Sequence, residues 1–455
     1  MDDIADATES QAAPARRLLT LWDLVFFGII LVQPVAPLSL FGIAQQLSDG
    51  HTATIILVAM FAMCITAVSY GRMAALYPSA GSAYTYVGKG LNPQLGFLTG
   101  WAMFLDYLLQ PLVSTVWIST AIHDAYVPQI PFAVWAAIVS AAIVLLNLGG
   151  VRSSARTNKG LLFVMLAVAG CFIVLAARFL YVTAGWHGVW SSKPFYDPAT
   201  FNLQRIVQAT SFAVVTYVGF DGVTTLTEDV VNPRRNVLLA SVLVCLFTGL
   251  FGCLLVYLGQ LVWPDWHTFG SLETAFMEVC GRVGGPALFN AMGLVLTLAY
   301  FGSGLAGELG AAKLLLGMGR DNALPRGFFG HLRPGTSTPT YNIIAIGLLG
   351  FVGAEVLHST GNALEHANEM INFGAFLAFM GVNLATFWQF AVVRRRIRRP
   401  SVLADMVCPL GGFAFCSIIW WNLNPLAKTA GAIWFAIGLL YMAATTRGFR
   451  STPGL

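Results

Sequence analysis

Twelve long runs of apolar residues dominate the chain. Each is about 20 residues long or longer, the length that an α-helix needs to cross the hydrocarbon core of a membrane. The runs lie at residues 21–47, 52–75, 95–122, 131–148, 160–183, 206–227, 237–262, 286–318, 340–357, 367–393, 403–421 and 429–446. The pattern predicts an all-α polytopic membrane protein with twelve transmembrane helices.

Two of these runs contain helix breakers in their middle. The first run is interrupted at Gln33-Pro34-Val35-Ala36-Pro37 and the sixth at Tyr217-Val218-Gly219-Phe220-Asp221-Gly222. Unwound backbone persists inside a bilayer only where protein, a water-filled cavity or a ligand satisfies its N–H and C=O groups. A simple proline kink is the alternative for the first run. The pair of breaks, half a chain apart, instead favours a transporter whose substrate binds between them.

Composition and charge agree with this class and give an orientation. Hydrophobic residues make up 57% of the 455 residues and charged residues only 10%, against about 25% in soluble domains. Placing the N-terminus inside puts twenty Lys and Arg residues on the cytoplasmic side and five outside, which predicts cytoplasmic N- and C-termini. The net charge of +4 then reflects topology and does not indicate nucleic-acid binding. The seven cysteines show no CxxC pair, so neither a disulfide framework nor a metal site is expected.

The even number of runs fits two five-helix units followed by two further helices. Because five is odd, the second unit would enter the membrane from the opposite side, so the two units would be inverted repeats. The predicted division is a disordered tail at 1–20, a first repeat at 21–185, a second repeat at 186–400, peripheral helices at 401–446 and a cytoplasmic tail at 447–455.

A series of short motifs resembles the amino acid-polyamine-organocation permeases, and among them most closely the putrescine importers. The motifs are SDGH at 48–51, SYG at 69–71, AGSAYTY at 80–86, NPQLGF at 92–97, LDYL at 105–108, GFDGVTTLTED at 219–229, SGLA at 303–306, MGRDN at 318–322 and INFGAF at 371–376. The resemblance implies ten core helices in two inverted repeats, two peripheral helices, and a substrate held beside the breaks in spans 1 and 6.

The residues at the two breaks are the first candidates for substrate binding. Exposed N–H and C=O groups at a broken helix can hold a substrate carboxylate and a substrate ammonium. The candidates are Gln33, Val35, Ala36 and Ser39 in span 1, and Tyr217, Gly219, Phe220 and Asp221 in span 6. Asp221 is either a ligand of the substrate or a structural anchor for the broken helix, since a carboxylate inside a span needs a cavity or a partner.

Two further carboxylates lie inside apolar runs. Asp106, with Trp101 and Tyr107 nearby in sequence, can hold an organic cation by charge and cation–π attraction, or form a buried hydrogen bond. Glu308 can exchange a coupling proton, or it can be a structural acid that is neutral or paired with Lys313.

The last candidate residues concern gating and ion coupling. The resemblance implies that Phe220 closes over the substrate. Glu228 and Asp229 are candidates for an inner gate with Arg234, Arg235 or Arg72, or else form a solvated helix end. Some proton-coupled relatives carry a lysine near the position of Met165, and this chain does not. Proton coupling through Asp106, Glu308 or Asp221 is the leading expectation, and a sodium site that includes Ser303 is the alternative.

The substrate is less clearly indicated than the site. In the putrescine-importer pattern the position of Ser39 is acidic, so this chain has lost one counter-charge for a diamine, and an amino acid or a monoamine competes. We expect a permease of the bacterial cytoplasmic membrane that binds a small amine or amino acid and no cofactor.

A channel would need rings of polar groups, and an enzyme would show a signature such as HExxH or GxSxG, which the chain lacks. A sensor built on a transporter fold is a further alternative, and the sequence does not indicate an oligomeric state.

Overall fold

The computed structural model describes residues 19–78, 81–149, 155–320, 324–332, 338–396, 401–446 and 448. In these ranges the chain is built of helices, and Leu19 and Val230 form an isolated backbone bridge. The two predicted tails lie outside the described residues, apart from Leu19, Thr20 and Gly448. Thr20 caps the first helix and exchanges hydrogen bonds with Asp23.

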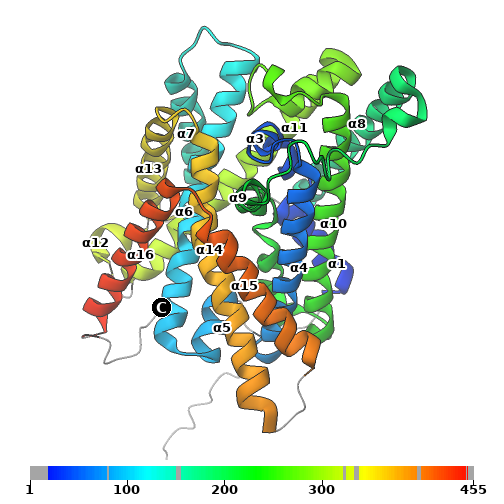
Figure 1. The fold of residues 1–455 in the computed structure, drawn as a ribbon. Coiled ribbons are helices and arrows are strands. Elements are labelled where there is room, and N and C mark those ends of the chain that lie inside the picture. The colour runs from blue at the N-terminus through cyan, green and yellow to red at the C-terminus, as the bar shows by residue number, and fades with distance from the viewer. Residues whose placement is uncertain are drawn as a thin grey trace, which may run out of the picture.

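The helices follow the apolar runs closely (Figure 1). Those of the first half are α1 (Leu21–Val32), α2 (Ala36–Ser39), α3 (Phe41–Leu47), α4 (Thr52–Leu76), α5 (Ser82–Gly90), α6 (Pro93–Ala125), α7 (Phe132–Leu148) and α8 (Ala155–Val189). Those of the second half are α9 (Leu203–Ala213), η1 (Val214–Tyr217), η2 (Phe220–Asp229), α10 (Pro233–Val262), η3 (Trp266–Thr268), α11 (Ala275–Arg320), α12 (Arg326–Phe329), α13 (Thr340–His358), α14 (Ala363–Phe387), η4 (Trp388–Val393), η5 (Arg394–Arg396), η6 (Val402–Val407), α15 (Cys408–Trp421) and α16 (Pro425–Thr445).

Ten helical segments among the described residues are long and apolar enough to cross a membrane. They account for ten of the twelve predicted spans. The other two predicted spans correspond to α6, which is long, and to α7, which is apolar but has only 17 residues. The short helix α5 lies between the second and third predicted spans, in a stretch where no helix was expected. The eighth span is longer than expected, because α11 already begins at Ala275 and passes through a kink at Gly285, whose φ is 67°.

The helices that carry the two breaks pack against the same partners. The segments α1 and η2 both lie against α10, and α4 packs along α10 and touches η2. Glycines permit this close packing: a Cβ atom on Gly71 of α4 would lie 2.5 Å from Leu238 Cα of α10. On the other side, α6 packs against α11 and α14, and the last two helices cover α14, with α15 also touching α4 and α16 touching α6.

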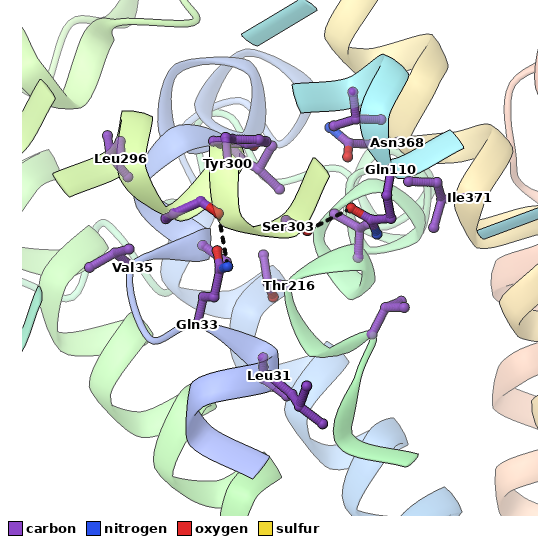
Figure 2. Close-up of a pocket in the computed structure, with 17 residues that line it drawn as sticks. Leu31, Gln33, Val35, Gln110, Thr216, Leu296, Tyr300, Ser303, Asn368 and Ile371 are labelled. Carbon is purple, nitrogen blue, oxygen red and sulfur yellow. Dashed lines mark hydrogen bonds between the residues drawn. The ribbon is translucent and has the colours of Figure 1, made fainter. Parts of the chain in front are cut away.

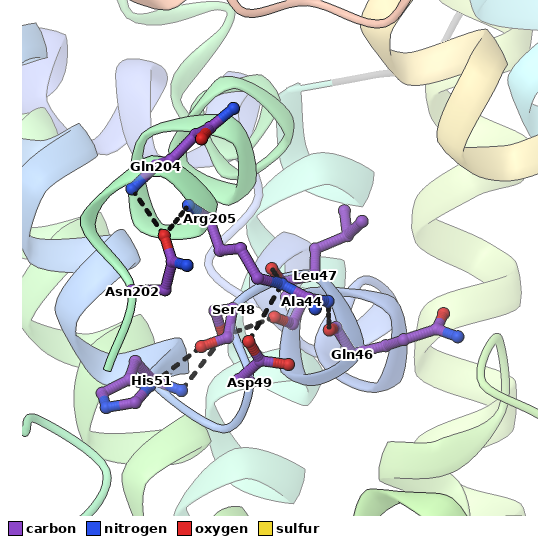
Figure 3. A network of polar contacts seen from close by, with 9 residues as sticks. All are labelled: Ala44, Gln46, Leu47, Ser48, Asp49, His51, Asn202, Gln204 and Arg205. Carbon is purple, nitrogen blue, oxygen red and sulfur yellow. Dashed lines mark hydrogen bonds and ion pairs between the residues drawn. The ribbon is translucent and has the colours of Figure 1, made fainter. Parts of the chain in front are cut away.

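A polar network connects the end of α3 to the start of α9 (Figure 3). Arg205 of α9 forms a 2.9 Å ion pair with Asp49, which follows α3. Its guanidinium also donates to the carbonyl oxygens of Gln46 (3.0 Å) and Leu47 (3.4 Å) at the end of α3. We define Arg205, Asp49 and these two carbonyls as the α3–α9 clamp.

Substitutions of the two charged residues of the clamp are expected to lower the thermal stability by different amounts. The ion pair is partly exposed, so it contributes no more than about 1 kcal/mol. Asp49→Asn is therefore expected to lower the thermal midpoint of the purified protein only slightly, whereas Arg205→Gln also removes the two carbonyl contacts and lowers it further. Thermal unfolding of both single variants and of the double variant checks this. Equal effects of the two single variants would contradict the role of the carbonyl contacts.

Candidate functional site

The first break separates α1 from α2. Gln33 ends α1 with a φ of 59°, and its N–H donates to the carbonyl of Ile29. Pro34 has no N–H to continue the helical hydrogen bonds of α1, so the backbone turns before α2 begins at Ala36. Pro37 lies in the first turn of α2, where a proline is tolerated. The Gln33 side chain donates from Nε2 to the carbonyl of Ala299 in α11 (3.0 Å), which fixes the break against that helix.

The second break separates η1 from η2. Val218 is extended, and Gly219 has a φ of 111°, a conformation that side-chain-bearing residues rarely adopt. The two breaks touch each other here. A Cβ atom on Gly219 would lie 3.5 Å from the Leu31 carbonyl oxygen, and one on Gly222 would lie 2.6 Å from Leu31 Cδ1. Glycine at position 222 thus allows η2 to approach Leu31 of α1 closely, whereas the contact at Gly219 is at an ordinary van der Waals distance.

A cavity of about 90 Å³ lies at the breaks (Figure 2). It is lined by Leu31, Val32, Gln33, Val35, Ala36, Leu40, Gln110, Val113, Val215, Thr216, Val218, Leu296, Ala299, Tyr300, Ser303, Asn368 and Ile371. Four of the sequence candidates are among them: Gln33, Val35, Ala36 and the coupling-ion candidate Ser303. The lining carries hydroxyl and amide groups but no charged side chain.

Asp106 is connected to this cavity through Gln110. The Ser303 hydroxyl donates to Gln110 Oε1 (2.8 Å), and Gln110 Nε2 donates to Asp106 Oδ1 (2.9 Å). The aromatic neighbours expected around Asp106 are placed differently. Trp101 stacks on Trp434 of α16 with ring centroids 4.9 Å apart, and Tyr107 is 44% exposed, so neither ring lines the cavity.

Asp221 lies at the start of η2 and is 8% exposed. Its carboxyl is next to the backbone N–H groups of Gly219 and Gly222 and to its own, as the anchor interpretation requires. Within the described part of the chain, neither Asp221 nor Asp106 has an ion-pair partner.

Three further candidates, Ser39, Tyr217 and Phe220, are not among the residues that line the cavity. Ser39 is buried, and its hydroxyl is 2.8 Å from that of the lining residue Tyr300. Tyr217 points away and donates to the Ile56 carbonyl (2.8 Å). Phe220 is fully buried between Tyr70 and Phe379, with ring centroids 5.4 and 5.3 Å away. The positive φ of Gly219 directs Phe220 into this aromatic cluster, so it does not cover the cavity.

The remaining acidic candidates, Glu228 and Glu308, are not among the residues that line the cavity. Glu228 and Asp229 are exposed, and Arg72 pairs with Asp405 of η6, while its guanidinium lies over the Phe390 ring. Glu308 is fully buried inside the helix bundle. It accepts a hydrogen bond from Asn147 Nδ2 of α7 (2.7 Å), and Lys313 is not its partner.

Several polar residues of the site were not predicted. Gln110, Thr216, Tyr300 and Asn368 line the cavity, and two acids, Glu369 and Asp405, are buried at 4% and 1% exposure. The signal was present in the sequence, because each is a polar group inside an apolar run. In α14, Asn368, Glu369 and Asn372 lie within two helical turns of one another.

Comparison with known proteins gives consistent results. The amino acid permease family matches residues 35–446. The chain is 32% identical to the low-affinity putrescine importer PlaP of Escherichia coli K12, over 96% of this chain and 95% of the relative. It is 24% identical to the methylthioribose transporter of Bacillus subtilis, over 95% and 94%. It is also 24% identical to the branched-chain amino acid permease BcaP of Lactococcus lactis, over 95% of each. The fold resembles the crystal structure of the Eremococcus coleocola manganese transporter, with a TM-score of 0.56, 13% identity, and 98% and 99% of the two chains covered.

Proposed function

Because the chain belongs to the amino acid permease family, we propose that it imports a small organic diamine of the putrescine type. The resemblance predicted from the motifs is confirmed at the family level. The chain is an integral membrane transporter for amines or amino acids, and its relatives are permeases, not enzymes. The choice of a diamine is supported by the E. coli relative and by the arrangement of two carboxylates.

The pair Asp106 and Asp221 is the observation that carries the diamine proposal. Asp106 is linked to the cavity lining through Gln110, and Asp221 lies beside the second break. Neither carboxyl has an ion-pair partner among the described residues, and an unpaired carboxylate is costly in a low-dielectric environment. A molecule with an ammonium group at each end would neutralise both. The acid that is missing at Ser39 is then not needed, because Asp106 supplies the second negative charge. The uncharged polar cavity next to Gln110 provides the approach to this pair.

A neutral amino acid is the second candidate. The cavity lining is uncharged, and among the described residues the Val35 N–H has no backbone hydrogen-bond partner. A free N–H at the start of a helical segment suits a substrate carboxylate, and the unpaired carbonyls of the other half suit its ammonium.

For the membrane arrangement we propose the one that the sequence predicts. The protein would have twelve spans, with α6 and α7 as the third and fourth, inverted repeats at 21–185 and 186–400, and peripheral helices at 401–446. The cytoplasmic membrane of a bacterium would hold it with both termini inside. Transport would proceed by alternating access, in which α1, α4, η2 and α10 move against the remaining helices.

Import is proposed to be coupled to protons. Asp106, Asp221 and Glu308 are the carboxyl groups that the sequence suggests for this role. Sodium is the alternative, with Ser303 as one ligand, but the Ser303 hydroxyl already donates to Gln110.

A ligand screen separates the two substrate candidates. A ligand present at 100 times its Kd stabilises the native state by about 2.7 kcal/mol. Putrescine is therefore expected to raise the thermal midpoint of the purified protein, and butylamine, which has the same carbon chain but one ammonium group, is expected to raise it much less. Thermal unfolding in detergent measures both. A shift with neutral amino acids and none with putrescine would contradict the diamine proposal and support the second candidate.

A further inference from the structure

Glu369 is a buried carboxylate in α14 that neither substrate candidate uses. It is 4% exposed and accepts a hydrogen bond from the backbone N–H of Asn424, the residue that caps α16. The preceding residue, Asn368, lines the cavity. The carboxyl is therefore held at the beginning of α16, and its neighbour in α14 borders the cavity.

Glu369 also faces the outer half of the broken sixth span. The Ser211 hydroxyl of α9 lies beside its carboxyl and, in this structure, donates to the Gln208 carbonyl (2.6 Å). One turn further along α14, Asn372 Nδ2 donates to the Ser211 carbonyl (2.6 Å). The contact between α14 and α9 at this level consists of Ser211 on one side and Glu369 with Asn372 on the other.

The charges around Glu369 leave it without a full counter-charge. Glu365 and His366 lie on the preceding turn of α14, and both are partly exposed. From α16 it faces the Asn424 N–H and the more distant charge of Lys428, whose ammonium donates to the Trp421 carbonyl (2.7 Å). No ion pair to Glu369 is found in the described ranges. The start of α16 supplies only the partial positive charge of a helix N-terminus.

We propose that Glu369 binds the proton that is coupled to transport, and that its protonation sets how firmly α9 is held to α14. This inference rests on the proposed proton-coupled function. When the carboxyl is ionised, the Ser211 hydroxyl can turn from the Gln208 carbonyl and donate to it. When hydronium transfers a proton to form an O–H bond on the carboxyl, leaving water, the carboxyl loses its negative charge and the hydrogen bond from the Ser211 hydroxyl weakens. The contact between α9 and α14 then depends on the bond from Asn372 Nδ2 to the Ser211 carbonyl.

A weaker contact at α9 affects the first break as well. The α3–α9 clamp connects α9 to α3, so one protonation loosens the hold of α14 on both half-helices. The O–H bond breaks again when the carboxyl becomes accessible to water on the other side and the proton leaves. Asp106, Asp221 and Glu308 do not contact α9 in this way.

Proteoliposome assays with Glu369→Gln test the proposal, because glutamine keeps the shape but cannot exchange a proton. Counterflow of labelled putrescine at equal pH is expected to stay within about twofold of wild type. Accumulation driven by an imposed pH gradient is expected to fall at least tenfold, to the level without a gradient. Full gradient-driven accumulation by the variant would overturn the proposal, and loss of counterflow in a correctly inserted variant would also overturn it.

Two further variants give controls. Glu365→Gln removes a carboxylate one turn away and is expected to keep gradient-driven accumulation. Ser211→Ala keeps Glu369 but removes the hydroxyl on α9, and it is expected to lower accumulation with counterflow retained. If Glu369→Gln fails to insert, unchanged accumulation by Ser211→Ala overturns the proposal. Absence of counterflow of putrescine and of amino acids in the wild-type protein would instead refute the proposed transport function.

Discussion

Asp221→Asn is expected to abolish uptake of the diamine while the protein still inserts into the membrane. Asparagine has the shape of aspartate but no charge, so one substrate ammonium would be buried without a partner. Removing one member of a buried, hydrogen-bonded charge pair costs about 2–5 kcal/mol, and 1.4 kcal/mol corresponds to a factor of ten. Uptake at low substrate concentration should therefore fall about 30-fold or more. Uptake of labelled putrescine into cells, normalised to the amount of inserted protein, measures this.

The control and a second variant define the role of the pair. Asp265→Asn makes the same chemical change at a carboxylate that is 61% exposed in a connecting segment, and it should leave uptake unchanged. Asp106→Asn should lower uptake of putrescine as strongly as Asp221→Asn does. Full uptake by Asp221→Asn would remove this residue from the substrate site and leave it as an anchor of η2.

Gly374→Ala is expected to have the second largest effect, through the packing of α14 against α6. A Cβ atom at this position would lie 2.2 Å from the Ala102 carbonyl oxygen, so the two helices would have to move apart. Overpacking of this kind typically costs about 1–3 kcal/mol. Because Gln110 and Asn368 lie on these same two helices, the separation also disturbs the cavity. The thermal midpoint should fall clearly, and uptake should fall with it.

Gly302→Ala in α11 is the matched control. A Cβ atom there meets no heavy atom within 4 Å, so the change adds no clash. Alanine is also favoured over glycine in a helix by about 1 kcal/mol, and the midpoint should stay the same or rise. The close approach of α6 and α14 would be refuted if the two variants unfolded at the same temperature.

The sequence was sufficient to predict the helices and the breaks because their physical causes are local. Apolar runs determine where a span can lie. Pro34 lacks the N–H that would continue the helical hydrogen bonds of α1, and Gly219 adopts a positive φ that other residues rarely adopt. Helix α5 was missed because its residues are mixed in polarity and it lies between two spans. The part of α11 that precedes Gly285 was not predicted, because the pair Gly285-Pro286 is typical of the end of a loop.

The candidate site was predicted only in part, because side-chain direction depends on tertiary structure. Gln33, Val35 and Ala36 line the cavity, since residues next to an unwound segment border the space that it opens. Phe220 points elsewhere because the positive φ of Gly219 turns the chain. Gln110, Tyr300 and Asn368 were missed because a neutral polar residue in an apolar run is less conspicuous than an acid. Their role becomes visible only when α6, α11 and α14 are placed together.

The α3–α9 clamp has a mechanical consequence for the two unwound segments. When a helix is unwound in its middle, each half can ordinarily tilt independently of the other. Here Arg205 contacts the last turn of α3, so a tilt of α9 is passed on to α3 through the clamp. The strength of this coupling is set by two carbonyl contacts and one partly exposed ion pair. The two broken helices are therefore mechanically coupled to each other, and neither half-helix tilts independently of the clamp.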